Sequence, residues 1–152
     1  MAAKTLKVPV NQLYDEDFAV WTEEMARLLR ERRFDEADIE HLAEEIEDMG
    51  KRDSREVFRR ARLILMHVLK WKFQPEARSG SWMVTINTQR RDLLLVLKDS
   101  PSLKRKLRDS APEVYADAVK DASGDTGLPR RAFPTDCPFP LEDILNSEFL
   151  PE

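Results

Sequence analysis

The chain has 152 residues, of which 41% are hydrophobic and 36% are charged, with one cysteine, four glycines and nine prolines. A chain of about 100 to 200 residues is typical of one soluble domain, and this composition excludes a collagen, a disulfide scaffold and a long disordered tail. Residues 1–12 lack the apolar run of a secretory signal, and no apolar stretch approaches the roughly 20 residues of a membrane span. With only Cys137 available, no internal disulfide can form, so we expect a cytoplasmic protein with no membrane partner.

Charge is segregated along the chain, although the net charge is only −4. Residues 1–50 carry 6 basic and 14 acidic side chains, residues 51–108 carry 16 and 5, and residues 109–152 carry 3 and 10. One interpretation is that the acidic ends fold over the basic middle and neutralise it. The other is an exposed basic face for nucleic acid or an acidic protein, although nucleic-acid modules are usually basic overall and this chain is acidic.

The N-terminal third predicts two amphipathic helices after an N-terminal arm over residues 1–12. The first begins near Asp15, which can cap it. The second follows Phe34, with Asp35 or Asp38 as its cap and Gly50 as its stop. The two apolar stripes are Phe18, Trp21, Met25, Leu28 and Leu29, and then Ile39, Leu42, Ile46 and Met49.

The middle of the chain predicts a helix over about 54–73 and another over about 82–98. The first becomes apolar almost all round, which is typical of a central buried helix, and Pro75 ends it. Ser79 or Ser81 is expected to cap the second.

The helix start marked by Ser100 and Pro101 is followed by a second such signal at Pro112. Residues 111–123 are therefore either a sixth helix or a kinked continuation.

Residues 124–152 are rich in proline and include Phe133 and Phe139. This pattern predicts an extended wrap that aromatic side chains hold to the surface, with a short helix over about 140–146. No run alternates like a strand. The sequence thus predicts one all-α domain over 13–152, with five or six helices around a central buried helix.

Several short motifs follow one another between residues 13 and 151. They are Leu13-Tyr14-Asp15 with Asp17-Phe18 and Trp21, Leu42-Ala43-Glu44-Glu45-Ile46 through Gly50, His67-Val68-Leu69-Lys70-Trp71-Lys72, Ser81-Trp82 with Thr85-Ile86 and Gln89-Arg90, Asp99-Ser100-Pro101-Ser102-Leu103, and Cys137-Pro138-Phe139. In combination and order they resemble a bacterial family catalogued as domain of unknown function twenty-nine. The resemblance implies a small helical domain and brings no assigned activity.

Arg90 presents a buried-charge problem, because it lies on the centre line of an apolar stripe. The stripe is Met83, Ile86, Leu93, Leu94 and Leu97. A buried guanidinium must be paired, since an isolated buried charge costs several kcal/mol or more. We expect a bidentate pair with Glu45 that fixes the register of two packed helices. The functional alternative is that Arg90 binds an anionic ligand.

His67 lies among apolar neighbours, with Leu63 one turn before it and Trp71 one turn after it. Burial disfavours its charged form, so we expect a neutral, hydrogen-bonded core residue. A general base would need a positioned partner, and the sequence identifies none. A small enzyme or an anion site around Glu45, His67 and Arg90 is therefore kept only as an alternative.

A metal site is not expected. Asp38, His41 and Glu45 follow one another at one-turn spacings, but a di-iron bundle needs a second Glu-x-x-His and the residue three before His67 is Ile64. No cofactor motif is present, so we expect no cofactor.

Two basic clusters, residues 52–62 and 104–108, are the remaining candidate binding sites. The binding residues expected at lower priority are Arg52, Arg55, Arg59, Arg60 and Arg90. No aromatic residue interleaves the clusters as single-strand binding requires. Because no catalytic constellation emerges, we expect a protein-binding or regulatory module without catalysis. The alternative is a nucleic-acid-binding module through the two clusters, with an affinity that falls steeply with salt.

Overall fold

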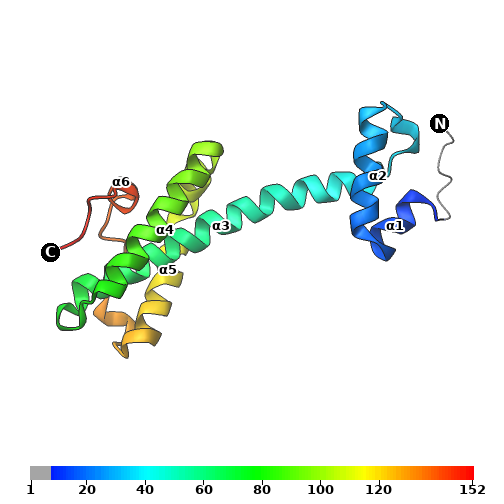
Figure 1. Cartoon of the computed structure of the whole chain (residues 1–152). Helices are drawn as coiled ribbons and strands as arrows, with labels where there is room; N and C mark the ends of the chain where they lie inside the picture. Colours follow the sequence, from blue (N-terminus) through cyan, green and yellow to red (C-terminus); the bar gives the residue numbers. More distant parts are fainter. Residues whose placement is uncertain (1–7) are drawn as a thin grey trace. The chain divides into compact units, whose positions relative to one another are not determined.

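A computed structural model describes residues 8–152, and within them the chain is all-helical with no strand (Figure 1). The α-helices are α1 (Val10–Glu16), α2 (Phe18–Arg30), α3 (Ile39–Phe73), α4 (Gly80–Asp99), α5 (Ser102–Thr126) and α6 (Leu141–Leu145), and the short 3-10 turns are η1 (Phe34–Glu36), η2 (Pro75–Ala77) and η3 (Arg130–Ala132). The predicted all-α class is confirmed. Most of the predicted arm over 1–12 lies outside the described residues, and the last three of its residues already belong to α1.

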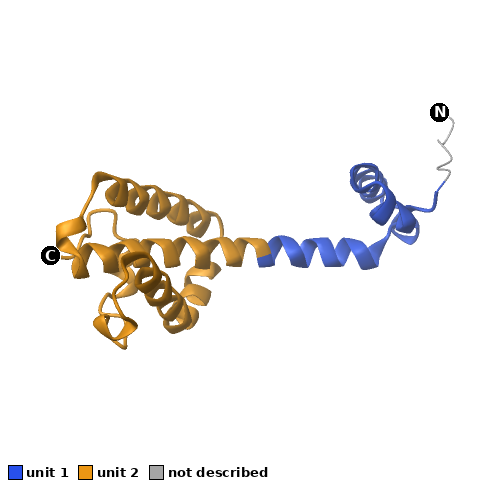
Figure 2. Cartoon of the chain, turned by 90° about the horizontal axis from the view of Figure 1, so that it is seen from below, with its two compact units in different colours: residues 1–51 blue, residues 52–152 orange. Residues whose placement is uncertain are grey.

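The chain divides into two compact units, residues 1–51 and residues 52–152 (Figure 2). Helix α3 contributes its first part to unit 1 and the rest to unit 2. Each unit is described by itself below. The expectation of one domain over 13–152 stays a prediction.

Unit 1 begins with α1 and α2, which Asp17 separates. The backbone of Asp17 is non-helical, with φ −153° and ψ 86°, and its carboxylate accepts the N–H of Val20 at 3.2 Å. Asp17 therefore caps α2, and the predicted cap, Asp15, is wrong because it lies within α1. Trp21 and Met25 are buried as their stripe predicts.

Helix α3 is continuous over 35 residues, so the predicted stop at Gly50 is wrong. It starts where predicted, because Asp38 Oδ1 accepts the N–H of His41 at 3.4 Å. A glycine inside a helix costs only about 1 kcal/mol, and the surrounding residues are mostly good helix formers. Among the described glycines, Gly127 after α5 has a positive φ, 76°, and Gly50 does not.

Unit 2 is built around the second part of α3, which confirms the predicted central helix. Figure 2 shows other helices of the unit on both sides of it. Its buried apolar residues are Val57, Ala61, Ile64, Leu65, Val68 and Leu69. Side chains of α4, α5 and the C-terminal segment complete this core.

The later elements agree with most expectations. The hydroxyl of Ser79 accepts the N–H of Trp82 at 3.4 Å and caps α4. Helix α5 runs through Pro112, so residues 111–123 continue it. Phe133 and Phe139 are buried, and α6 lies in the predicted place. The extended wrap over 124–152 stays a prediction.

Replacing Gly50 tests the continuity of α3. A Cβ at this position meets no atom within 4 Å, so Gly50→Ala should remove the helix penalty of glycine and stabilise the protein by about 0.5–1 kcal/mol. We expect a higher Tm by circular dichroism. The matched control is Gly127→Ala, which should lower the Tm because its φ of 76° suits glycine. A fall in Tm for both variants would place the helix end at Gly50 and contradict the fold.

Candidate functional site

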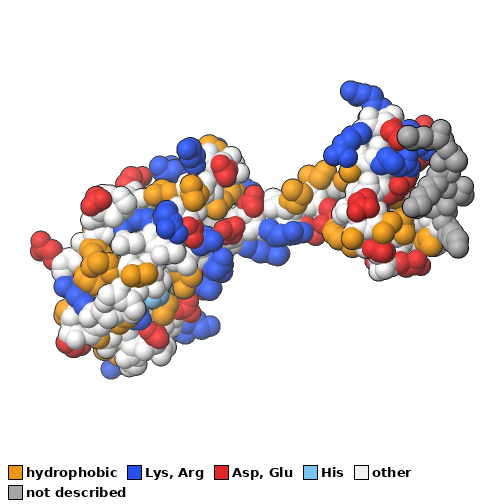
Figure 3. Space-filling view, viewed as in Figure 1, with side chains coloured by type: hydrophobic (Ala, Val, Ile, Leu, Met, Phe, Trp, Pro, Cys, Tyr) orange, Lys and Arg blue, Asp and Glu red, His pale blue; other side chains and the backbone are white. Residues whose placement is uncertain are grey.

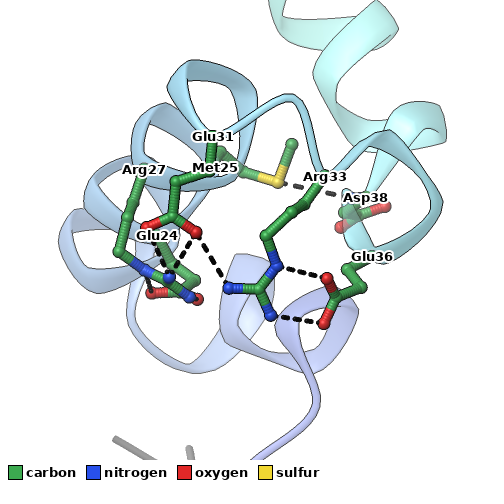
Figure 4. Close-up of polar contacts among 7 residues, drawn as sticks. All are labelled: Glu24, Met25, Arg27, Glu31, Arg33, Glu36 and Asp38. Atoms are coloured by element: carbon green, nitrogen blue, oxygen red, sulfur yellow. Dashed lines mark hydrogen bonds and ion pairs between the residues drawn. The ribbon is translucent and has the colours of Figure 1, made fainter. Parts of the chain in front are cut away.

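The polar centre of unit 1 is Asp38, which is only 8% exposed at the start of α3. Its Oδ2 accepts the indole N–H of Trp21 at 3.0 Å and lies 2.7 Å from His41 Nδ1. Its backbone N–H lies 3.3 Å from Met25 Sδ (Figure 4). These contacts tie α2 to the first turn of α3.

Tyr14 of α1 packs against His41. Its ring stacks on the imidazole with a centroid distance of 3.9 Å and an interplanar angle of 9°. Its hydroxyl donates to Glu45 Oε1 at 2.6 Å. That hydrogen bond raises the pKa of Tyr14 to about 12, because a nearby carboxylate favours the neutral phenol. Helices α1 and α2 thus contact α3 on the side that carries His41 and Glu45.

Asp38 and His41 favour each other's charged form. Burial opposes ionisation of Asp38, but the hydrogen bonds from His41 and Trp21 outweigh it and lower the pKa of the carboxyl. The hydrogen bond to Asp38 raises the pKa of His41 above its ordinary value. The network therefore favours the ion-paired form of Asp38 and His41 at the start of α3.

The guanidinium groups of Arg27 and Arg33 are engaged by nearby glutamates (Figure 4). Arg27 pairs with Glu24 and donates to Glu31 at 3.0 and 3.1 Å. Arg33 donates to Glu31 at 2.9 Å and to Glu36 at 2.6 Å. These hydrogen bonds from Arg33 lower the pKa of both glutamates. The connection between α2 and α3 thus satisfies these charges locally.

A different side of α3 in unit 1 is apolar and exposed. Ile39 is 52% exposed, and Ile46 and Met49 are each 60% exposed. Their spacing of seven and then three residues puts them on one side of the helix; we call these three residues the α3 face. Figure 3 shows hydrophobic side chains along this first part of α3. Of the predicted stripe, Leu42 alone packs against the cluster around Trp21.

Acidic side chains occupy other sides of the same stretch of α3. Glu40, Glu44 and Glu47 are exposed, and none has a hydrogen bond or ion pair with any residue of the described range 8–152. Asp48 lies 3.9 Å from Lys51. The sides of α3 away from the α3 face therefore carry glutamates without an ion-pair partner in the described chain.

Arg90 is buried as predicted, at 1% exposure, but its partners are main-chain carbonyls. Nε donates to Ile144 O at 2.8 Å and Nη1 to Phe149 O at 3.1 Å. The predicted pair with Glu45 is therefore wrong. Burial lowers the pKa of Arg90, and within the described chain Nη2 finds no acceptor. The guanidinium holds the C-terminal segment against α4, which favours the structural interpretation over an anion site.

His67 is half-buried and bonds to its own helix. Its Nδ1 lies 2.8 Å from Leu63 O, so that nitrogen carries the proton. Burial lowers the pKa of His67, as expected for a neutral core residue. Sequence reasoning did not predict the burial of Lys70, which is 5% exposed, pairs with Asp125 and lies 4.3 Å from the ring centroid of Trp82.

The basic cluster over 52–62 is partly neutralised. Arg52, Arg55 and Arg59 are exposed, whereas Arg60 is half-buried and pairs with Glu56 at 2.8 Å. Three ion pairs join the basic middle of the chain to its acidic C-terminal block: Arg62–Asp121, Lys70–Asp125 and Arg108–Glu142. Within unit 2 the acidic C-terminal block thus neutralises part of the basic middle, as one of the two interpretations predicts.

The structure does not assemble a metal centre from the candidate ligands. Asp38 and His41 touch each other, but Glu45 accepts from Tyr14. In residues 8–152 no group of three or more His, Cys, Asp or Glu side chains could hold a metal ion. Cys137 donates to Phe139 O at 3.3 Å, and burial raises the pKa of its thiol. No helix of this range is long and apolar enough to cross a membrane.

Proton NMR can follow both histidines of the chain individually, because there are only two. We expect His41 to titrate above its ordinary pKa of 6.5 and His67 below it. Asp38→Asn should return the His41 midpoint toward 6.5 and leave His67 unchanged. A His41 midpoint at or below 6.5 in the unaltered protein would contradict the network.

The same network fixes the sign of the pH dependence of stability. The contribution of His41 is fully present below its unfolded pKa and is lost as the pH rises through its raised folded pKa. The contribution of Asp38 is present above its unfolded pKa and is lost as the pH falls through its lowered folded pKa.

Comparison with known families identifies a matching family. The family model described as "Domain of unknown function DUF29" matches residues 13–150, in agreement with the motifs. No curated protein and no solved structure matches the chain.

Proposed function

This chain belongs to the DUF29 family, and we propose that it is a protein-binding module that acts through the α3 face. The observation that carries the proposal is the exposed apolar side formed by Ile39, Ile46 and Met49. Contacts from Trp21 and Tyr14 hold another side of the same helix in place. A helix anchored on one side and apolar on another offers a surface on which a second helix can pack.

A partner that covers the α3 face would gain binding free energy by burying its exposed apolar side chains. Scattered exposed apolar residues are ordinary on protein surfaces, but these three share one side of one helix. Full burial of an Ile or Met side chain contributes about 1.5–3 kcal/mol. Covering the three would contribute on the order of 3–5 kcal/mol before the entropic cost of association.

The two alternatives have less support. For nucleic acid, Arg60 and Arg62 already engage carboxylates. An enzyme built around Glu45, His67 and Arg90 would need these three side chains to act on one substrate. Instead Glu45 accepts from Tyr14, and His67 and Arg90 each bond main-chain carbonyls.

Site-specific cross-linking tests the proposal. With p-benzoylphenylalanine in place of Ile46, irradiation in the cells of origin should give an adduct with one discrete protein, because this side chain faces the partner. A second substitution in the same chain, Met49→Glu, should remove the adduct. The matched controls are Val84 and Leu95 of α4, which are 64% and 56% exposed and should give no such adduct.

Two results would contradict a protein-binding role for the α3 face. One is an adduct that forms equally well from Val84 or Leu95. The other is an adduct that disappears on nuclease treatment, which would favour the nucleic-acid alternative.

A further inference from the structure

His41 lies where α1 and α2 meet the first turn of α3. Its imidazole stacks on the ring of Tyr14 from α1 at a centroid distance of 3.9 Å, and its Nδ1 lies 2.7 Å from Asp38 Oδ2. The same carboxylate oxygen accepts the indole N–H of Trp21 from α2 at 3.0 Å. One histidine of α3 therefore takes part, directly or through Asp38, in contacts that hold both preceding helices.

The ionisable groups around His41 favour its protonated form. The carboxylates that raise the pKa of His41 are Asp38 and Glu44 of α3 and Asp15 of α1. From α2 comes the uncharged indole of Trp21. Tyr14 stays a neutral phenol, because its hydrogen bond to Glu45 raises its pKa to about 12. A change of pH near neutrality therefore alters the charge of His41 and leaves that of Tyr14 unchanged.

One proton on His41 strengthens both attachments. Its charge adds Coulomb attraction to the hydrogen bond with Asp38, which is 8% exposed and therefore poorly screened by water and salt. A cation is also attracted to the face of an aromatic ring, and the ring of Tyr14 lies nearly parallel to the imidazole, at 9°. A neutral imidazole can still donate to Asp38, but it has lost both of these charge attractions.

The apolar contacts that accompany these polar ones are few. Among the described residues of unit 1, the cluster around Trp21 has three buried members, Leu13, Trp21 and Met25. A small apolar cluster contributes limited stability by burial alone. The charge of His41 can therefore decide how often α1 and α2 open from α3.

We infer that His41 is a pH-sensitive switch in unit 1, whose proton keeps α1 and α2 closed on α3 and whose loss lets them open. The pKa of His41 is raised in the closed form. The stabilisation is therefore fully present below the pKa of the open form and is lost as the pH rises through that of the closed form. Opening exposes Leu13, Trp21 and Met25, so a rise in pH uncovers apolar surface. This inference does not depend on a role for the α3 face.

Amide hydrogen exchange of the full chain tests the switch, because the protection of a helix measures how rarely it opens. Exchange is followed by NMR from about pH 5.5 to about pH 8.5, and each rate is corrected for its intrinsic dependence on pH. We expect the protection of α2 to fall about fivefold or more across this range, with the midpoint of the His41 ring titration in the same samples. Helices α4 and α5 are internal references and should keep their protection within about twofold.

Three variants separate His41 from other causes of a pH dependence. His41→Gln carries no proton, so α2 should be weakly protected across the whole range. Asp38→Asn keeps a side-chain acceptor and a good helix cap but removes the negative charge, so it should flatten the pH dependence as well. The matched control is His67→Gln, which removes the other histidine and should leave the pH dependence of α2 unchanged. Circular dichroism verifies that each variant is folded.

Several results would overturn the inference. They are protection of α2 that is independent of pH in the unaltered protein, a pH dependence that persists in His41→Gln, and an equal loss of the pH dependence in His67→Gln. An equal fall in the protection of α4 and α5 would also overturn it, because that result would indicate unfolding of the whole chain and not opening at His41.

Discussion

The hydrogen bonds to the carboxylate of Asp38 decide which side of α3 is covered in unit 1. Trp21 and His41 converge on one oxygen of this buried group, and they fix α2 and the first turn of α3 in one orientation. Once this contact is made, Leu42 faces the cluster around Trp21, while Ile39 and Ile46 face solvent. The exposed α3 face is therefore a consequence of how a buried charge is satisfied.

Unit 2 satisfies its own buried charge in a different way. Arg90 donates to the carbonyls of Ile144 and Phe149, so it joins the C-terminal segment to the core with no acidic partner. Removal of such a group would leave buried acceptors without a donor, which is costly. These bonds account for the burial of Arg90 within unit 2.

The sequence was most informative about features that depend on the spacing of residues along one helix. The burial of Arg90 and the central position of residues 54–73 follow from spacing alone, whereas spacing left Asp35 and Asp38 open as the cap. The partners of Arg90 could not be predicted. Every residue has a main-chain carbonyl, so the sequence does not show which carbonyl accepts the hydrogen bond. Gly50 was misleading since the cost of a glycine inside a helix is small. The apolar stripe through Ile46 was correctly placed on a helix. Periodicity does not show, however, whether that side of the helix is buried by the same chain.

The central claim is that the α3 face is open to solvent in the free protein, and methyl NMR with a soluble paramagnetic agent tests it most directly. The isoleucines provide internal references, because Ile46 is 60% exposed whereas Ile64 and Ile86 are fully buried. We expect strong relaxation enhancement at the methyl groups of Ile39 and Ile46 and little at those of Ile64 and Ile86. Protection of Ile46 equal to that of Ile64 would show that the face is already covered, and would contradict the account.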